Sequence, residues 1–122
     1  MKSKIILIDN FRRRAKPLLK KYASLVSELE KLGNELLENP RTGTIIGENL
    51  YKIRLSVKSK GKGKSGGMRL ITYVVEIELI VEETREQDFT IFLLTIYDKS
   101  ERNNISDKEI EELLKDIDLT EE

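Results

Sequence analysis

Residues 50–73 read LYKIRLSVKSKGKGKSGGMRLITY and set the architecture of the second half of the chain. Apolar and basic residues alternate in Tyr51–Lys58, which is the pattern of a strand with one buried face. Ser59–Gly67 then holds four glycines, three lysines and two serines, and a second strand-like segment begins at Met68. We therefore predict two strands joined by a glycine-rich loop.

The residues before this stretch predict one strand and two helices. Lys4–Ile8 is rich in β-branched residues and is predicted as a short strand. Two sets of apolar residues with helical spacing follow, the first at Phe11, Ala15, Leu18 and Tyr22 and the second at Leu25, Leu29, Leu32 and Leu36. An interior proline costs a helix about 3 kcal/mol, so we expect a kink at Pro17 or a helix that begins there. The second helix should end before Asn39, and Arg41–Asn49 should be a loop.

The residues after this stretch predict a long hairpin and a last helix. Met68–Glu82 and Phe89–Tyr97 are strand-like and are separated by the polar segment Glu83–Asp88. Because Phe89–Tyr97 is apolar on both faces, we expect it to be central in the sheet. A capping box, SDKE at residues 106–109, opens the last helix. The order β-α-α-β-β-β-α predicts one α+β domain over residues 1–122, with a mostly antiparallel, four-stranded sheet.

Composition excludes several kinds of chemistry. The 122 residues contain no cysteine and no histidine, which removes disulfides, thiolate metal sites and histidine-based nucleophile activation. We therefore expect neither a metal nor a cofactor. No apolar run approaches the roughly 18–20 residues of a membrane span, and the N-terminus does not resemble a signal peptide. The sequence predicts a soluble cytoplasmic protein without a membrane partner.

The charges are segregated although Lys+Arg and Asp+Glu are equal at 22 each. Residues 50–73 carry seven basic residues and no acid, whereas residues 76–88 carry six acids and one arginine. If the two strands pair, Lys52, Arg54 and Lys58 converge with Arg69 on one surface. Like charges brought together repel each other, so such a surface indicates a polyanionic partner. A flexible, solvated loop is the competing interpretation.

Gly63, Lys64 and Ser65 look like the end of a phosphate-binding P-loop, but two requirements of that motif are missing. The motif needs a glycine five residues before Gly63, where the chain has Lys58. It also needs a helix after the loop, where the sequence predicts a strand. The two missing requirements argue against nucleotide binding. RNA is our hypothesis for the polyanion.

Several segments together resemble HigB-like toxins of the RelE/ParE superfamily, which belong to type II toxin–antitoxin systems. The segments are KIR at 52–54, KGKGKSGG at 60–67, RLITY at 69–73 and LTIYDKSE at 94–101. The resemblance implies two N-terminal helices packed on a twisted sheet. It also implies an endonuclease that cleaves mRNA in the ribosomal A site. A cognate antitoxin, often a HigA-like helix-turn-helix protein, would neutralise it.

RNA carries its own nucleophile, the 2′-OH, so a protein without histidine can cleave it. A lysine crowded by other cations loses its proton more easily than usual, so Lys60, Lys62 or Lys64 could be the base. Arg69 fits as a clamp on the phosphate. Tyr97 or Lys99 could supply a proton or stack on a base. The predicted catalytic residues are Lys60, Lys62, Arg69, Tyr97 and Lys99, and the predicted RNA-binding residues are Lys52, Arg54, Lys58 and Lys64.

The chain departs from the family pattern after Lys99. RelE-type toxins often have an arginine and then a tyrosine there, where this chain has Ser100 and Ile105. The identity of the proton donor therefore stays open. Two other functions remain: a ParE-like inhibitor of DNA gyrase, against which the lysine-rich loop argues, and an RNA-binding module without catalysis.

Overall fold

The computed structural model describes residues 1–61 and 66–117. It confirms the α+β class. The elements in chain order are β1 (Lys2–Leu7), α1 (Asp9–Lys21), α2 (Leu25–Glu38), β2 (Thr44–Gly47), β3 (Leu50–Leu55), the 3-10 turn η1 (Lys58–Lys60), β4 (Met68–Val81), β5 (Thr84–Asp98) and α3 (Asp107–Leu114). None of the helices in the described ranges is long and apolar enough to cross a membrane.

Within the residues that the structure describes, the strands form one mixed sheet of five strands in the order β1-β5-β4-β3-β2. β1 runs parallel to β5, and every other pairing is antiparallel. The expected number of four strands was wrong, because β2 lies inside the segment that we predicted to be a loop. The predicted turn at residues 83–88 was also wrong, since β5 already begins at Thr84. The prediction that residues 89–97 form a central strand is confirmed, because β5 lies between β1 and β4.

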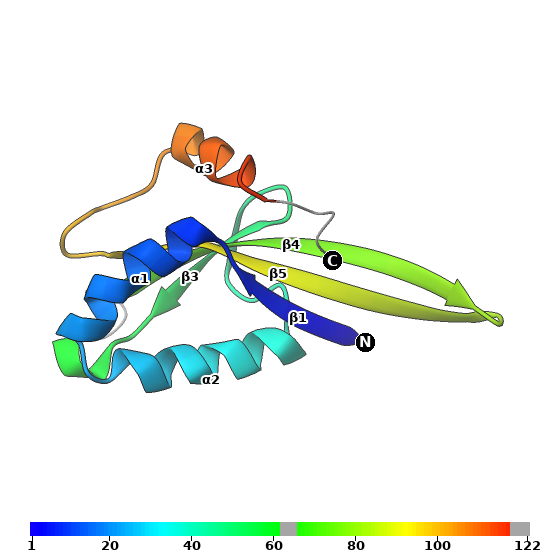
Figure 1. Ribbon diagram of the computed structural model, residues 1–122, viewed down its shortest axis with the longest axis horizontal. Coiled ribbons are helices and arrows are strands. Elements are labelled where there is room, and N and C mark those ends of the chain that lie inside the picture. The colour runs from blue at the N-terminus through cyan, green and yellow to red at the C-terminus, as the bar shows by residue number, and fades with distance from the viewer. Residues whose placement is uncertain (62–65, 118–122) are drawn as a thin grey trace.

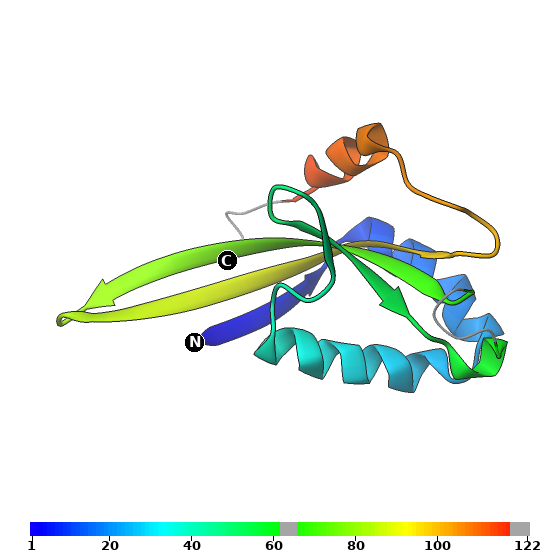
Figure 2. The same cartoon turned by 180° about the vertical axis from the view of Figure 1, so that it is seen from behind.

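The two faces of the sheet are covered by different helices. α1 and α2 pack on one face and α3 packs on the other (Figure 1), and the view from behind shows the same layers (Figure 2). Ile53, Leu70 and Ile91 belong to the core under α1 and α2. Ile71 and Phe92 belong to the core under α3. Neighbouring residues of one strand thus enter different cores, as the period of two in a strand requires.

Two of the three predictions about where helices begin and end are confirmed. α2 ends at Glu38, before Asn39 as predicted. α3 begins with the predicted capping box, in which the Ser106 hydroxyl accepts a hydrogen bond from the Glu109 amide at 3.2 Å. α1, however, continues as a helix from Asp9 to Lys21 with Pro17 inside it, so no helix begins at Pro17. Burial of Phe11 and Ala15 against the sheet stabilises α1 against the cost of the proline.

The far end of the β4–β5 hairpin extends beyond the rest of the molecule (Figure 1). Its exposed residues include Ile80, which is 70 % exposed. Glu82 and Glu83 make the turn with φ of 48° and 70°. Left-handed backbone costs a residue with a side chain about 1–2 kcal/mol, and two-residue hairpin turns therefore favour Asn-Gly. The tip thus combines an unfavourable turn with few packing partners.

Glu82→Asn combined with Glu83→Gly should stabilise this tip. We expect amide hydrogen exchange of β4 and β5 residues next to the turn to slow by about 5- to 30-fold, because the substituted turn removes roughly 1–2 kcal/mol of strain. Glu86→Asn, in the β5 strand, is the matched control and should give no slowing. Unchanged exchange in the turn variant would show that the left-handed turn is not what limits the stability of the tip.

Candidate nucleic-acid interface

Two arginines and a tyrosine form a row across three strands on the face that α3 covers. Arg54 of β3 lies directly opposite Arg69 of β4. Arg69 in turn lies opposite Tyr97 of β5. Arg69 is the second residue of β4, so it stands at the end of the strand and shares a face with Ile71, as the alternation predicts. We call these three residues the Arg-Arg-Tyr row.

A bulge in β5 brings Tyr97 into this row. The register shifts between Ile71 and Thr72, which pair with Thr95 and Leu93, so Leu94 is an extra residue in β5. An extra residue reverses the alternation of every residue that follows it. Leu94 and Tyr97 therefore both belong to the core on the α3 side. Without the bulge, Tyr97 would face α1 and α2.

Lys52 lies beside the row, and the two arginines of the row affect its pKa. It precedes Arg54 by two residues in β3, so both side chains lie on the same face. Its Nζ donates a hydrogen bond to the Asn104 amide oxygen at 2.8 Å. Burial, followed by repulsion from Lys99, Arg69 and Arg54, lowers the pKa of Lys52 below its usual value. We call Lys52, Arg54, Arg69 and Lys99 the cationic cluster.

The segment between β5 and α3 closes one side of the cluster. Lys99 donates a hydrogen bond from Nζ to the Asn103 carbonyl oxygen. Arg102 lies over the Tyr97 ring, with its guanidinium carbon 5.6 Å from the ring centroid, and forms an ion pair with Glu109 of α3. Arg102 was not among the predicted site residues, because nothing in the sequence shows that this segment folds back over Tyr97.

Tyr97 combines burial with an unpaired hydroxyl. The residue is 7 % exposed, and its hydroxyl has no hydrogen-bond partner within the described residues. Burial raises its pKa, although Arg69 and Arg102 oppose that shift. A tyrosine with a raised pKa keeps its proton near neutral pH. It can therefore donate a hydrogen bond or a proton and is unsuited to act as a base.

Lys60 is on the opposite side of the sheet and has a carboxylate partner. Its Nζ lies 2.7 Å from both carboxylate oxygens of Asp98, and the two side chains are 5 % and 1 % exposed. It also donates to the Tyr22 hydroxyl at 3.3 Å and the Ser100 hydroxyl at 3.1 Å. Asp98 follows Tyr97 in β5 and therefore points to the face that α1 covers.

The ion pair changes the titration of both partners. Burial alone would lower the pKa of Lys60, but its hydrogen bonds to Asp98 and Tyr22 outweigh burial and raise it. From the sequence we expected neighbouring cations to lower the pKa of a lysine such as Lys60. For Lys60 this direction was wrong, because its neighbour in the fold is the Asp98 carboxylate. Burial alone would raise the pKa of Asp98, but hydrogen bonds from Lys60 and Ser100 lower it to about 2.

The other predicted lysines do not join the cluster in the described structure. We predicted that Lys58 shares a strand face with Lys52 and Arg54. This prediction was wrong, because β3 ends at Leu55. Lys58 lies in η1, and its amide donates to the Glu28 carboxylate of α2 at 2.7 Å. Lys62 and Lys64 lie outside the described residues. Of the nine predicted site residues, the structure thus brings together Lys52, Arg54, Arg69, Tyr97 and Lys99.

The Lys60–Asp98 pair predicts sensitivity to acid. The pKa of Asp98 is about 2 in the folded chain, against about 3.9 in an unfolded one. The ionised form therefore stabilises the fold above the unfolded pKa, and this contribution is lost as pH falls through the folded pKa. We expect it to amount to about 2 kcal/mol between roughly pH 5 and pH 1. Urea unfolding of the wild type and of Asp98→Asn across this range measures it, because only the wild type should show this component.

Comparison with known proteins assigns no family to the chain. No protein-family model matches it, and no solved structure matches it. Within residues 1–61 and 66–117, no group of three or more Asp or Glu side chains is placed to hold a metal ion. The candidate site therefore rests on its own geometry.

Proposed function

We propose that the protein is the toxin of a type II toxin–antitoxin system and cleaves mRNA on the ribosome, in the cytoplasm, without a metal or cofactor. A ribosome would hold the mRNA in its A site, and the cationic cluster would bind the RNA backbone there. A cognate antitoxin, a HigA-like helix-turn-helix protein, would be the partner that blocks this activity. The proposed class of protein comes from the resemblance of residues 52–101 to HigB-like toxins. The cationic cluster supports this proposal because it can bind an RNA backbone.

The observation that carries the proposal is the Arg-Arg-Tyr row. Like charges directly opposite each other on neighbouring strands destabilise a sheet. The fold nevertheless places Arg54 opposite Arg69 and adds Lys52 beside them. A phosphate bound across the row would be attracted by Lys52, Arg54 and Arg69 together. Such a phosphate could also accept a hydrogen bond from the Tyr97 hydroxyl, which is buried without a partner in the described chain.

The cluster can assist cleavage by the 2′-OH of RNA. The 2′-oxygen attacks phosphorus and forms a new P–O bond, the P–O5′ bond breaks, and the products are a 2′,3′-cyclic phosphate and a 5′-OH. A neutral Lys52 would take the 2′-OH proton, and Tyr97 or Lys99 would give a proton to the leaving 5′-oxygen. Arg69 and Arg54 would stabilise the charge that develops on the phosphate. Holding the RNA in line for attack would supply most of the rate.

Lys52 as the base predicts a particular dependence on pH. Burial and the neighbouring cations lower the pKa of Lys52. Because Lys52 must lose its proton to act as a base, the single-turnover rate constant should rise by about one log unit per pH unit as long as the pH is below that pKa. Lys52→Arg keeps the charge and cannot lose its proton, so it should lower the rate by about 10²- to 10⁴-fold and flatten the profile. Lys108→Arg, on α3, is the matched control. A rising profile that persists in Lys52→Arg would assign the base to another group.

Expression without an antitoxin tests the function as a whole. We expect growth arrest, with mRNA cut at defined positions and carrying 5′-OH ends, and we expect cutting in a purified translation system only when ribosomes are present. Arrest with intact mRNA and impaired supercoiling would favour gyrase inhibition. Binding of RNA without any cut would favour the non-catalytic module.

A further inference from the structure

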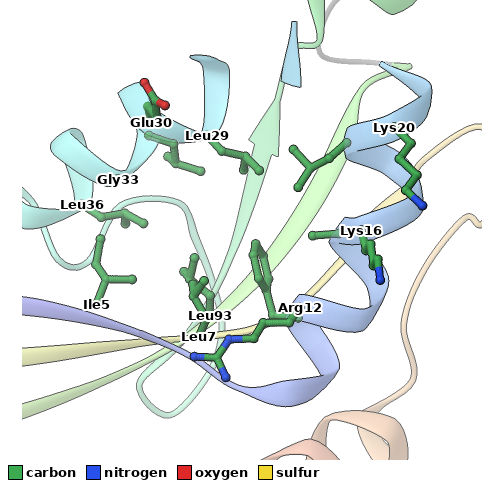
Figure 3. Close-up of a pocket in the computed structure, with 14 residues that line it drawn as sticks. Ile5, Leu7, Arg12, Lys16, Lys20, Leu29, Glu30, Gly33, Leu36 and Leu93 are labelled. Atoms are coloured by element: carbon green, nitrogen blue, oxygen red, sulfur yellow. The ribbon is translucent and has the colours of Figure 1, made fainter. Parts of the chain in front are cut away.

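A groove of about 670 Å³ opens between α1, α2 and the strands β1 and β5, on the face of the sheet opposite the cationic cluster. Its walls are apolar and include Ile5, Leu7, Phe11, Leu29, Leu36 and Leu93. Figure 3 shows the side chains of Ile5, Leu7, Leu29, Leu36 and Leu93 around the space between the two helices. Ile5, Leu7 and Leu29 are only half-buried, so the fold leaves apolar surface uncovered here. A concave apolar surface of this kind suits the apolar face of a binding partner.

One rim of the groove is basic. Arg12, Lys16 and Lys20 all come from α1, at intervals of four residues (Figure 3). This spacing places them in a row of about 12 Å along one side of the helix. Arg12 has a weak, exposed contact with Asp9 at 3.5 Å. Within the described residues, no carboxylate lies within ion-pair distance of Lys16 or Lys20.

The other rim of the groove is formed by α2, which places one acidic residue and one glycine there. Glu30 of α2 lines the groove on that side. Gly33 follows it one turn later, and a methyl group at Gly33 would lie 3.8 Å from Cδ1 of Ile5, at ordinary contact distance. The glycine therefore leaves space between α2 and β1 that a larger side chain would fill.

We propose that this groove binds an amphipathic helix of another protein, whose apolar face enters the groove and whose acidic flank meets Arg12, Lys16 and Lys20. An apolar groove bounded by helices can take a helix by anchors spaced at i, i+3 or i+4 and i+7. Acidic residues with the same spacing along one flank match the basic row. The inference does not depend on nuclease activity, because it uses no residue of the cationic cluster.

Selection from a library of displayed helical peptides of about 20 residues tests the proposal. The immobilised full-length protein should enrich peptides with apolar anchors at i, i+3 or i+4 and i+7 and with Asp or Glu along one flank. Lys16→Glu combined with Lys20→Glu should enrich Lys and Arg at those flanking positions instead. Enrichment without an acidic flank on the wild type, or no enrichment, would overturn the proposal.

The best peptide is then synthesised and its affinity measured by fluorescence anisotropy. We expect affinity to fall about tenfold or more in Lys16→Glu/Lys20→Glu and to weaken with added salt. Gly33→Phe, which fills the groove, should abolish binding, whereas Gly33→Ala should retain it. Arg13→Glu/Lys108→Glu changes the same charge outside the groove and should bind normally. Equal binding to Gly33→Phe and wild type would overturn the proposal, as would a dimer of this chain that Gly33→Phe dissociates.

RNA cleavage is measured on the same variants. Groove variants should cleave as the wild type does, and Arg69→Lys should bind the peptide as the wild type does. A loss of peptide binding is thereby distinguished from a loss of RNA cleavage.

Discussion

Replacing Arg69 with lysine should lower the rate constant of RNA cleavage by about 10²- to 10³-fold and leave the fold intact. The substitution retains the positive charge but removes the planar fork of donors that can hold two phosphate oxygens at once. Arg69 is the central residue of the Arg-Arg-Tyr row and is 5 % exposed, so a bound phosphate would be shielded from water there. Donors in such a site stabilise developing charge far more than donors in water do.

The measurement is a single-turnover cleavage assay on programmed ribosomes, with the melting temperature as a check of folding. Arg85→Lys is the matched control, because it makes the same chemical change at the hairpin tip, where Arg85 pairs with Glu78 at 3.4 Å. We expect the control to cleave like the wild type. A folded Arg69→Lys variant with normal cleavage would remove the row from the mechanism.

The overall architecture was readable from the sequence because its strands have strong local patterns. Alternation in β3 placed Lys52 and Arg54 together and Tyr51 and Ile53 on the buried face, and the structure confirms both. The apolar run of β5 correctly indicated a central strand. β2 was missed because its four residues, two of them glycine or threonine, carry no alternation and form a strand only by pairing with β3.

The site was less predictable, because it depends on long-range pairing. The position of Tyr97 is set by the extra residue in β5, and a strand that is apolar on both faces gives no sign of a bulge. Lys60 was grouped with the cations because its neighbours in sequence are basic. Its actual partners, Tyr22 and Asp98, are 38 positions away on either side and meet it only in the folded chain. Charge density along the sequence therefore grouped Lys58 and Lys60 with the cations of β3 and β4, although the fold separates both lysines from the cationic cluster.

The stability of the fold should depend strongly on the Lys60–Asp98 ion pair. Both side chains are almost fully buried, so removing either one leaves the other as an uncompensated buried charge. We expect Lys60→Met and Asp98→Asn each to lower the free energy of unfolding by about 3–5 kcal/mol. The double variant leaves no charge and keeps acceptors and donors for Tyr22 and Ser100. It should therefore lose less than the sum of the single variants, with a coupling energy of about 2–3 kcal/mol in urea unfolding.

The same double variant separates a structural from a catalytic role of Lys60. If Lys60 only holds η1 and the end of β5 in place, restoring stability should also restore cleavage, and the rate of Lys60→Met/Asp98→Asn should approach that of the wild type. If Lys60 takes the proton of the 2′-OH, as the sequence suggested, the double variant should be stable and inactive. The raised pKa of Lys60 favours the first result, since an ammonium group held by a carboxylate is a poor base. A stable, inactive double variant would show that Lys60 is a catalytic residue, and it would assign the role of base to Lys60 instead of Lys52.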